Sequence, residues 1–95
     1  MTVPPWKAWY NTSRWRALRL QVFRRDAYVC QHTGVVCTGH HPDPRSPVAN
    51  HRIPHRGNPA LFWDIDNIET VTKQHHDTAI QRDEQDSLHE RGVWY

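Results

Sequence analysis

The sequence of 95 residues predicts a single small α+β domain in which an N-terminal helix packs on a β-hairpin. Three observations support this class. An arginine-rich segment near the N-terminus has helical periodicity, two short runs of β-branched residues follow it, and a helix-favouring segment comes last. The chain is long enough for one domain only, with a core so small that a metal or a partner would help to stabilise it.

The first helix is expected over residues 13–29. Ser13 is a suitable N-cap, and Trp15, Leu18 and Val22 fall on one helical stripe. Arginines cover much of the remaining surface. This helix should therefore pack through its apolar stripe and present a basic outer face.

The hairpin is expected from "VANHRI" (48–53) and "IETVTK" (68–73), which read as two short strands. The connection between them contains Gly, Pro and Asn and reads as a loop. It also holds three large apolar residues that should form an internal plug, namely Leu61, Phe62 and Trp63. From about Gln74 the chain favours helix, which should end near Gly92.

Charge is distributed unevenly along the chain. Residues 1–58 carry a net charge of +7 and residues 59–95 a net charge of −5. A basic half of this kind suggests a polyanion such as nucleic acid as partner. The alternative is a solvated helix face that the acidic end of the same molecule neutralises.

The chain contains no apolar run of about 18 residues, and its first ten residues lack the apolar region of a signal peptide. We therefore expect a cytoplasmic protein with no membrane partner. In that compartment its two cysteines should be reduced thiols or metal ligands and not a disulfide.

Three polar residues of the hairpin and last helix could share one concave site: His51, Asn67 and His76. A neutral imidazole can act as a general base near pH 7, a second can hold a divalent cation, and an asparagine can fix a loop through its backbone. The alternative is a set of surface histidines in a histidine-rich protein.

The run "VANHRIPHRGNPALFWDIDN" followed by "KQHHD" resembles the HNH endonuclease family, in particular the short HNH nucleases of bacteriophages and prophages. The segment "YNTSRWRALRLQVFRRDAYVC" is also similar to the way those chains begin. The resemblance implies a ββα-metal (HNH/His-Me finger) fold in a single nuclease domain, 1–95. That domain would comprise an N-terminal arm (1–12), the helix (13–29) and the ββα-metal core (47–90).

The resemblance also implies roles for individual residues. His51 would be the general base for hydrolysis of a DNA phosphodiester bond, and Asn67 would hold the loop that aims it. Asn50 and His76 would hold one divalent metal ion, which could be Mg, Mn, Ni or Zn. The products would carry a 5′-phosphate and a 3′-hydroxyl, after nicking by a monomer or double-strand cutting by a dimer.

Three residues beside this site are interpreted as DNA- and phosphate-binding: Arg52, His55 and Arg56. For Arg56 the alternative is an exposed arginine in a tight turn. Relatives in phages commonly work beside the packaging machinery, so by analogy a terminase is an expected partner, in the cytoplasm of the bacterial host.

One departure from the family pattern concerns the metal. Asn50 stands where most relatives have an aspartate, and an amide oxygen brings no negative charge. Asn50 could ligate weakly, another group such as His55 or Asp77 could compensate, or the chain could be a DNA-binding module that cuts poorly or not at all.

A second departure concerns structural zinc. Many relatives hold zinc with four cysteines, of which only Cys30 is present here, with Thr33, Thr72 and His75 at the other positions. A zinc site could still form from Cys30, Cys37 and His75, completed by a loop histidine. The candidates for that completing ligand are His32, His40 and His41. The alternative is two buried, reduced thiols.

Overall fold

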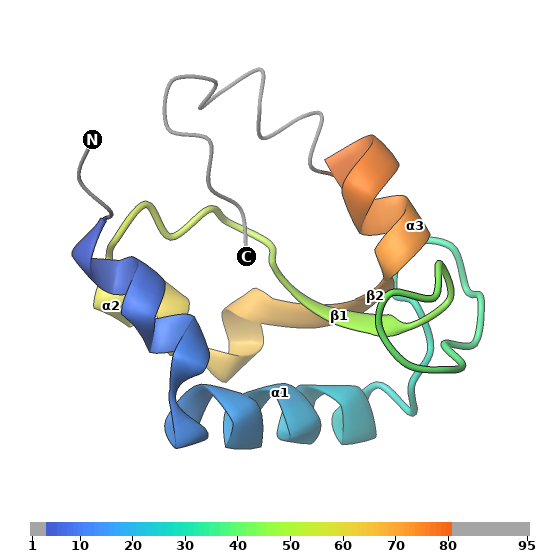
Figure 1. Cartoon of the computed structure of the whole chain (residues 1–95), viewed down its shortest axis with the longest axis horizontal. Helices are drawn as coiled ribbons and strands as arrows, with labels where there is room; N and C mark the ends of the chain where they lie inside the picture. Colours follow the sequence, from blue (N-terminus) through green and yellow to red (C-terminus); the bar gives the residue numbers. More distant parts are fainter. Residues whose placement is uncertain (1–3, 81–95) are drawn as a thin grey trace.

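The computed structural model describes residues 4–80 of the chain and has the predicted α+β class (Figure 1). Two strands form one antiparallel hairpin, and helices precede it, interrupt its connection and follow it. The elements in chain order are η1 (Pro5–Asn11), α1 (Ser13–Arg25), β1 (Pro47–His51), α2 (Pro59–Phe62), η2 (Ile65–Asn67), β2 (Ile68–Thr72), α3 (Lys73–His75) and η3 (His76–Ile80).

Helix α1 has a different N-cap and an earlier end than the sequence predicted. Thr12 and not Ser13 is the cap, and its hydroxyl oxygen accepts a backbone N–H of the first turn at 3.1 Å. The helix ends at Arg25 and not at residue 29, because residues 27–28 have φ angles of 55° and 58°. Such left-handed backbone cannot continue a right-handed helix.

The hairpin register places Pro47 opposite Thr72 and His51 opposite Ile68. One face of the hairpin therefore carries Ala49 and His51, and the opposite face carries Asn50. Figure 1 shows α1 lying along one side of the hairpin, while α3 leaves the end of β2 on the other side. Both strands end short of their predicted limits at residues 53 and 73.

The main core lies between α1, the hairpin and the inter-strand connection. Trp15 and Val22 of the predicted stripe are buried, Leu18 is partly buried, and Phe23 joins them. Phe62 is fully buried at the centre of the core, which confirms its place in the predicted plug. A smaller cluster on the opposite face of the hairpin contains Cys30, Cys37, Val71 and the partly buried Val48.

The inter-strand connection is more ordered than the predicted loop. Asn58 caps α2, its side-chain oxygen accepting the Ala60 N–H at 2.9 Å, and a proline at the first helical position suits the turn. Asp64 caps η2 in the same way through the Asp66 N–H at 2.9 Å. These two short turns carry the apolar plug into the core.

The last helix begins one residue earlier than predicted. The Thr72 hydroxyl accepts the His75 N–H at 3.3 Å and caps α3, which continues into the wider π-helical turn η3. The predicted end of this helix near Gly92 lies outside the described residues. Within residues 4–80, no helix is long and apolar enough to cross a membrane.

Candidate functional site

His51 is the last residue of β1, and its imidazole is buried, with 4% of the residue exposed. Its Nε2 lies 3.0 Å from the carbonyl oxygen of Phe62. Because a carbonyl only accepts, Nε2 carries the ring proton and donates it. Nδ1 then bears a lone pair, and it has no hydrogen-bond partner among residues 4–80.

Aromatic rings surround this imidazole. Trp15 of α1 stacks on it with ring centroids 5.3 Å apart and an interplanar angle of 15°. The rings of His55 and Phe62 lie 4.8 Å and 5.0 Å away. Burial in this apolar surround lowers the pKa of His51, only partly opposed by the Phe62 carbonyl, so the ring is neutral at physiological pH.

Asn67 connects both ends of the inter-strand loop. Its side-chain oxygen accepts the Ile53 N–H at 2.9 Å, and its amide donates to the carbonyls of Ile53 and Leu61 at 3.0 Å and 3.1 Å. Asn67 is itself buried. One side chain therefore fixes the loop segment next to His51 and the segment next to Phe62, which holds His51.

His55, which the sequence analysis interpreted as phosphate-binding, lies in the interior, with 5% of the residue exposed. Its Nδ1 accepts the Gly57 N–H at 3.0 Å, so the proton of the neutral ring is on Nε2, which donates to the Tyr10 hydroxyl oxygen at 2.8 Å. Burial, and then the charge of His51, lower its pKa to about 4. Both ring nitrogens are used within the protein, so His55 orders the loop against η1.

Asn50 faces a carboxylate that the sequence did not single out. Its amide donates to Glu69 Oε2 at 3.1 Å, and the two residues are direct partners across the hairpin. Both side chains are buried. Glu69 is also held by His32 through Oε2 and by Arg52, whose Nε lies 3.2 Å from Oε1.

His76 lies at the first position of η3 and is buried, with 1% of the residue exposed. Its Nδ1 is 3.6 Å from the carboxylate of Asp77, which in turn is paired with Lys73. Burial is the main cause that lowers the pKa of His76 to about 4. The ring is therefore neutral, the form in which an imidazole binds a metal.

The donor set can be tested against the divalent cation that the family resemblance implies. Asn50 offers an uncharged amide oxygen and His76 a neutral imidazole, while the carboxylate beside Asn50 belongs to Glu69. Over residues 4–80, no three His, Cys, Asp or Glu side chains are grouped to hold an ion. Asn50 and His76 supply one oxygen and one nitrogen, so a cation held by these two side chains would keep several water ligands, and the described residues do not form a closed zinc cage.

The turn after β1 leaves two arginines at the surface. Arg52 is exposed although its Nε contacts Glu69, and Arg56 is exposed with a φ of 50°. Gly57 follows with a φ of 86°, and a Cβ there would come within 2.7 Å of Trp6 Cδ1. The turn is therefore tight, and it requires glycine where η1 covers it.

The residues named for a structural zinc are divided between two places. Cys30 and Cys37 are buried free thiols that pack together with Val71. His75 instead lies beside His32, with ring centroids 4.9 Å apart. The two thiols and the two imidazoles do not form a metal-binding group among the described residues.

Comparisons with protein-family models, with curated proteins and with solved structures gave no match. The site is therefore characterised by its own geometry. That geometry brings His51, Asn67 and the loop together, and it pairs Asn50 with Glu69, which the sequence analysis missed. The missing signal was the register of the hairpin, which makes residues 50 and 69 neighbours.

Proposed function

We propose that this chain is a metal-dependent DNA endonuclease of the HNH type with a ββα-metal core. The observation that carries the proposal is His51, a buried neutral imidazole with one nitrogen held by a backbone carbonyl and the other without a partner among residues 4–80. A histidine that only fills a core usually satisfies both of its nitrogens, as His55 does here.

In this proposal His51 removes a proton from the water that attacks phosphorus. The Phe62 carbonyl fixes the Nε2–H tautomer, so the lone pair on Nδ1 is the basic site. The lowered pKa keeps that lone pair free of a proton at neutral pH. Asn67 maintains this geometry because it holds the loop that carries the Phe62 carbonyl.

Water must reach Nδ1 for this chemistry to occur. Nδ1 is buried, and of the rings around His51 those of Trp15, His55 and Phe62 are buried while that of Tyr10 is only half-buried. The Tyr10 ring centroid lies 6.5 Å from that of His51. We therefore expect Tyr10 to be the ring that moves when substrate binds.

A divalent cation would be held by His76 and by the Asn50 oxygen, with Glu69 supplying the negative charge that Asn50 lacks. When bound, the cation would neutralise charge on the phosphate and on the leaving 3′ oxygen. Glu69 is suited to supply this charge because it is buried and its Oε2 accepts the Asn50 side-chain N–H at 3.1 Å. Neither His55 nor Asp77 is needed as the compensating group.

One observation favours a second candidate, a DNA-binding module that cuts weakly or not at all. Glu69 already has His32, Asn50 and Arg52 as partners, so its charge is largely neutralised without a cation. In that case Arg52 and Arg56 would bind DNA, and His51 would matter little for the function.

A nicking assay on supercoiled plasmid distinguishes the two candidates. Wild type, His51→Ala and Glu69→Gln would each be tested with Mg²⁺, Mn²⁺, Ni²⁺ and EDTA. His40→Ala is the matched control, because His40 is exposed in the loop before β1. The nuclease proposal expects cleavage by wild type and the control only. A wild type that binds DNA but cuts with none of the cations would contradict it.

The family resemblance further suggests a phage or prophage origin and work beside a terminase in the bacterial cytoplasm. These remain predictions by analogy. Whether the chain nicks one strand or cuts both follows from the same plasmid assay, since linear and open-circular products separate on a gel.

A further inference from the structure

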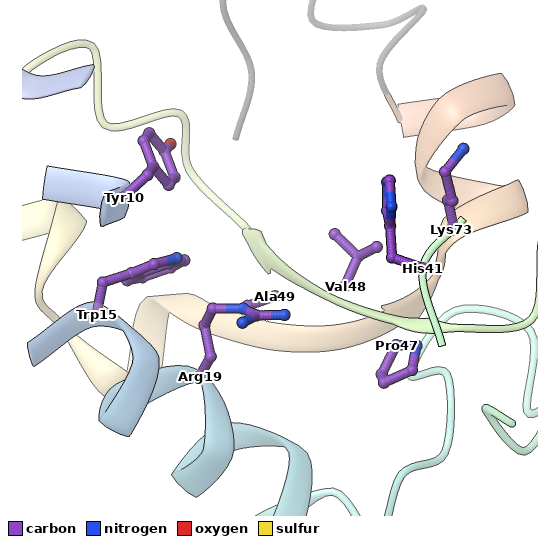
Figure 2. A pocket seen from close by; sticks show the side chains of 8 residues that line it. All are labelled: Tyr10, Trp15, Arg19, His41, Pro47, Val48, Ala49 and Lys73. Carbon is purple, nitrogen blue, oxygen red and sulfur yellow. The ribbon is translucent and has the colours of Figure 1, made fainter. Parts of the chain in front are cut away.

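A pocket of about 270 Å³ lies between α1, β1 and the first residue of α3 (Figure 2). Tyr10 and Trp15 form one wall, His41 and Lys73 lie at the opposite end, and Arg19 reaches up from α1 toward β1. Pockets that enclose a whole small ligand usually measure about 300–1,000 Å³. This one suits a single segment of a longer ligand.

Arg19 is the unusual member of this pocket. Its side chain is half-buried, and within residues 4–80 its guanidinium makes no hydrogen bond or ion pair. The contact it does make is to the ring of Phe23, 5.3 Å from the guanidinium carbon. Burial lowers its pKa, and among residues 4–80 no carboxylate acts in the other direction.

Arg25, another arginine of α1, has a structural role and differs from Arg19 in its partners. Arg25 binds the carboxylate of Asp26 and donates to the carbonyls of Ile65 and Ile68 at 2.9 Å and 2.6 Å. Arg19 has none of these partners although it has lost part of its water. A desolvated guanidinium without an anion is costly, so an anionic ligand would stabilise it.

The rest of the pocket also favours an anion. Lys73 brings a second cationic side chain, His41 an imidazole and Tyr10 a hydroxyl group. None of the residues described as lining the pocket is acidic. Lys73 is itself paired with the carboxylate of Asp77.

The pocket is adjacent to the proposed general base. Trp15, which lines it, stacks on His51, and Tyr10 contacts the same ring. Ala49, which also lines it, lies two residues before His51 on the same face of β1. A group bound here would be separated from His51 by one side chain.

We propose that this pocket binds a backbone phosphate of the DNA strand beside the bond to be cut, with Arg19 as its principal ligand. This inference rests on the proposed function, because it takes DNA as the substrate. Arg19 would donate two parallel N–H groups to the phosphate oxygens, and Lys73 would add charge from the opposite end. The contact positions the strand and does not read its sequence.

The test compares Arg19→Met with Arg24→Met. Both changes remove one arginine from α1 and keep a flexible apolar stem, but Arg24 is exposed and does not line the pocket. Binding of a labelled 20-base-pair duplex would be measured by fluorescence anisotropy in EDTA over a range of salt concentrations. We expect Arg19→Met to weaken binding at least about 10-fold and to reduce the salt slope by about one, and Arg24→Met to weaken it by less than about twofold.

A melting temperature for each variant checks that folding is intact. Removing an unpaired, half-buried cation should leave the melting temperature unchanged or higher, whereas a structural role for Arg19 would lower it. Equal duplex affinity for the two variants would overturn the inference. A pocket that binds a free nucleotide but not the DNA backbone would also overturn it. In that case a deoxynucleoside monophosphate would raise the melting temperature of wild type and not of Arg19→Met, while the two variants would bind the duplex with equal affinity.

Failure of this inference is distinguishable from failure of the proposed function. A wild type that binds the duplex through Arg19 but cleaves with no cation leaves the phosphate pocket supported and refutes the nuclease. A wild type that cleaves, with the same kcat/KM in Arg19→Met and Arg24→Met, supports the nuclease and refutes the pocket.

Discussion

Replacing Asn67 with alanine should destabilise the whole domain, because this side chain makes three hydrogen bonds to the loop backbone. Their lengths are 2.9, 3.0 and 3.1 Å, and Asn67 is buried. A typical intramolecular hydrogen bond contributes about 1 kcal/mol, and backbone groups left unpaired add to the loss. We therefore expect a decrease of about 3 kcal/mol in the free energy of unfolding. For a domain of this size, that lowers the melting temperature by about 12–24 °C.

The assay is urea and thermal unfolding followed by circular dichroism and tryptophan fluorescence at pH 7. Asn58→Ala is the matched control, because Asn58 is exposed and its side chain makes a single capping bond to Ala60. That change should cost about 0.5–1 kcal/mol. If Asn67→Ala proves no more destabilising than Asn58→Ala, then the loop is not held as the hydrogen bonds indicate.

Three further predictions concern the core, pH and the metal. Phe62→Ala should reduce the free energy of unfolding by about 3–5 kcal/mol, because it leaves a cavity beside the rings of Tyr10 and Trp15. A reduction below about 1 kcal/mol in urea unfolding would contradict that packing. His55 has a pKa of about 4 when folded and about 6.5 when unfolded, so below pH 6.5 the unfolded state binds the extra proton and stability falls with falling pH. Between pH 7 and pH 5 this residue should reduce the free energy of unfolding by about 2 kcal/mol. In urea unfolding at the two pH values, His55→Gln should therefore lose about 2 kcal/mol less than wild type. Equal losses would show that the pKa of His55 is not lowered in the folded state. Asn50→Asp would place two carboxylates opposite each other at residues 50 and 69. Because like charges repel, the melting temperature of this variant should fall in EDTA and recover with Mn²⁺. An unchanged melting temperature in EDTA would show that the two side chains are not in contact.

The main elements of the fold could be predicted because their patterns are local. The stripe of Trp15 and Val22 repeats with the helical period, and the β-branched run around Val71 reads as a strand. The cap of α1 was predicted at Ser13 and lies at Thr12, and the cap at Asn58 was not predicted. Each depends on one side chain meeting one backbone N–H, and periodicity carries no information about such a contact.

The site could be predicted only in part, for a similar reason. His51 and Asn67 were identified by residue type and by resemblance, and the structure shows how each is held. The burial of His55 depends on Tyr10, which comes from a distant part of the chain. Glu69 was missed because the long connection between the strands does not fix which residue lies opposite Asn50.

The pairing of Asn50 with Glu69 has a consequence for recognising chains of this kind. The two side chains meet across the hairpin, so a carboxylate on either strand would present its charge to nearly the same place. Evolution could then move the charge from one strand to the other if both positions changed together. A motif search that requires an acidic residue directly before the histidine would overlook every chain in which this transposition has occurred.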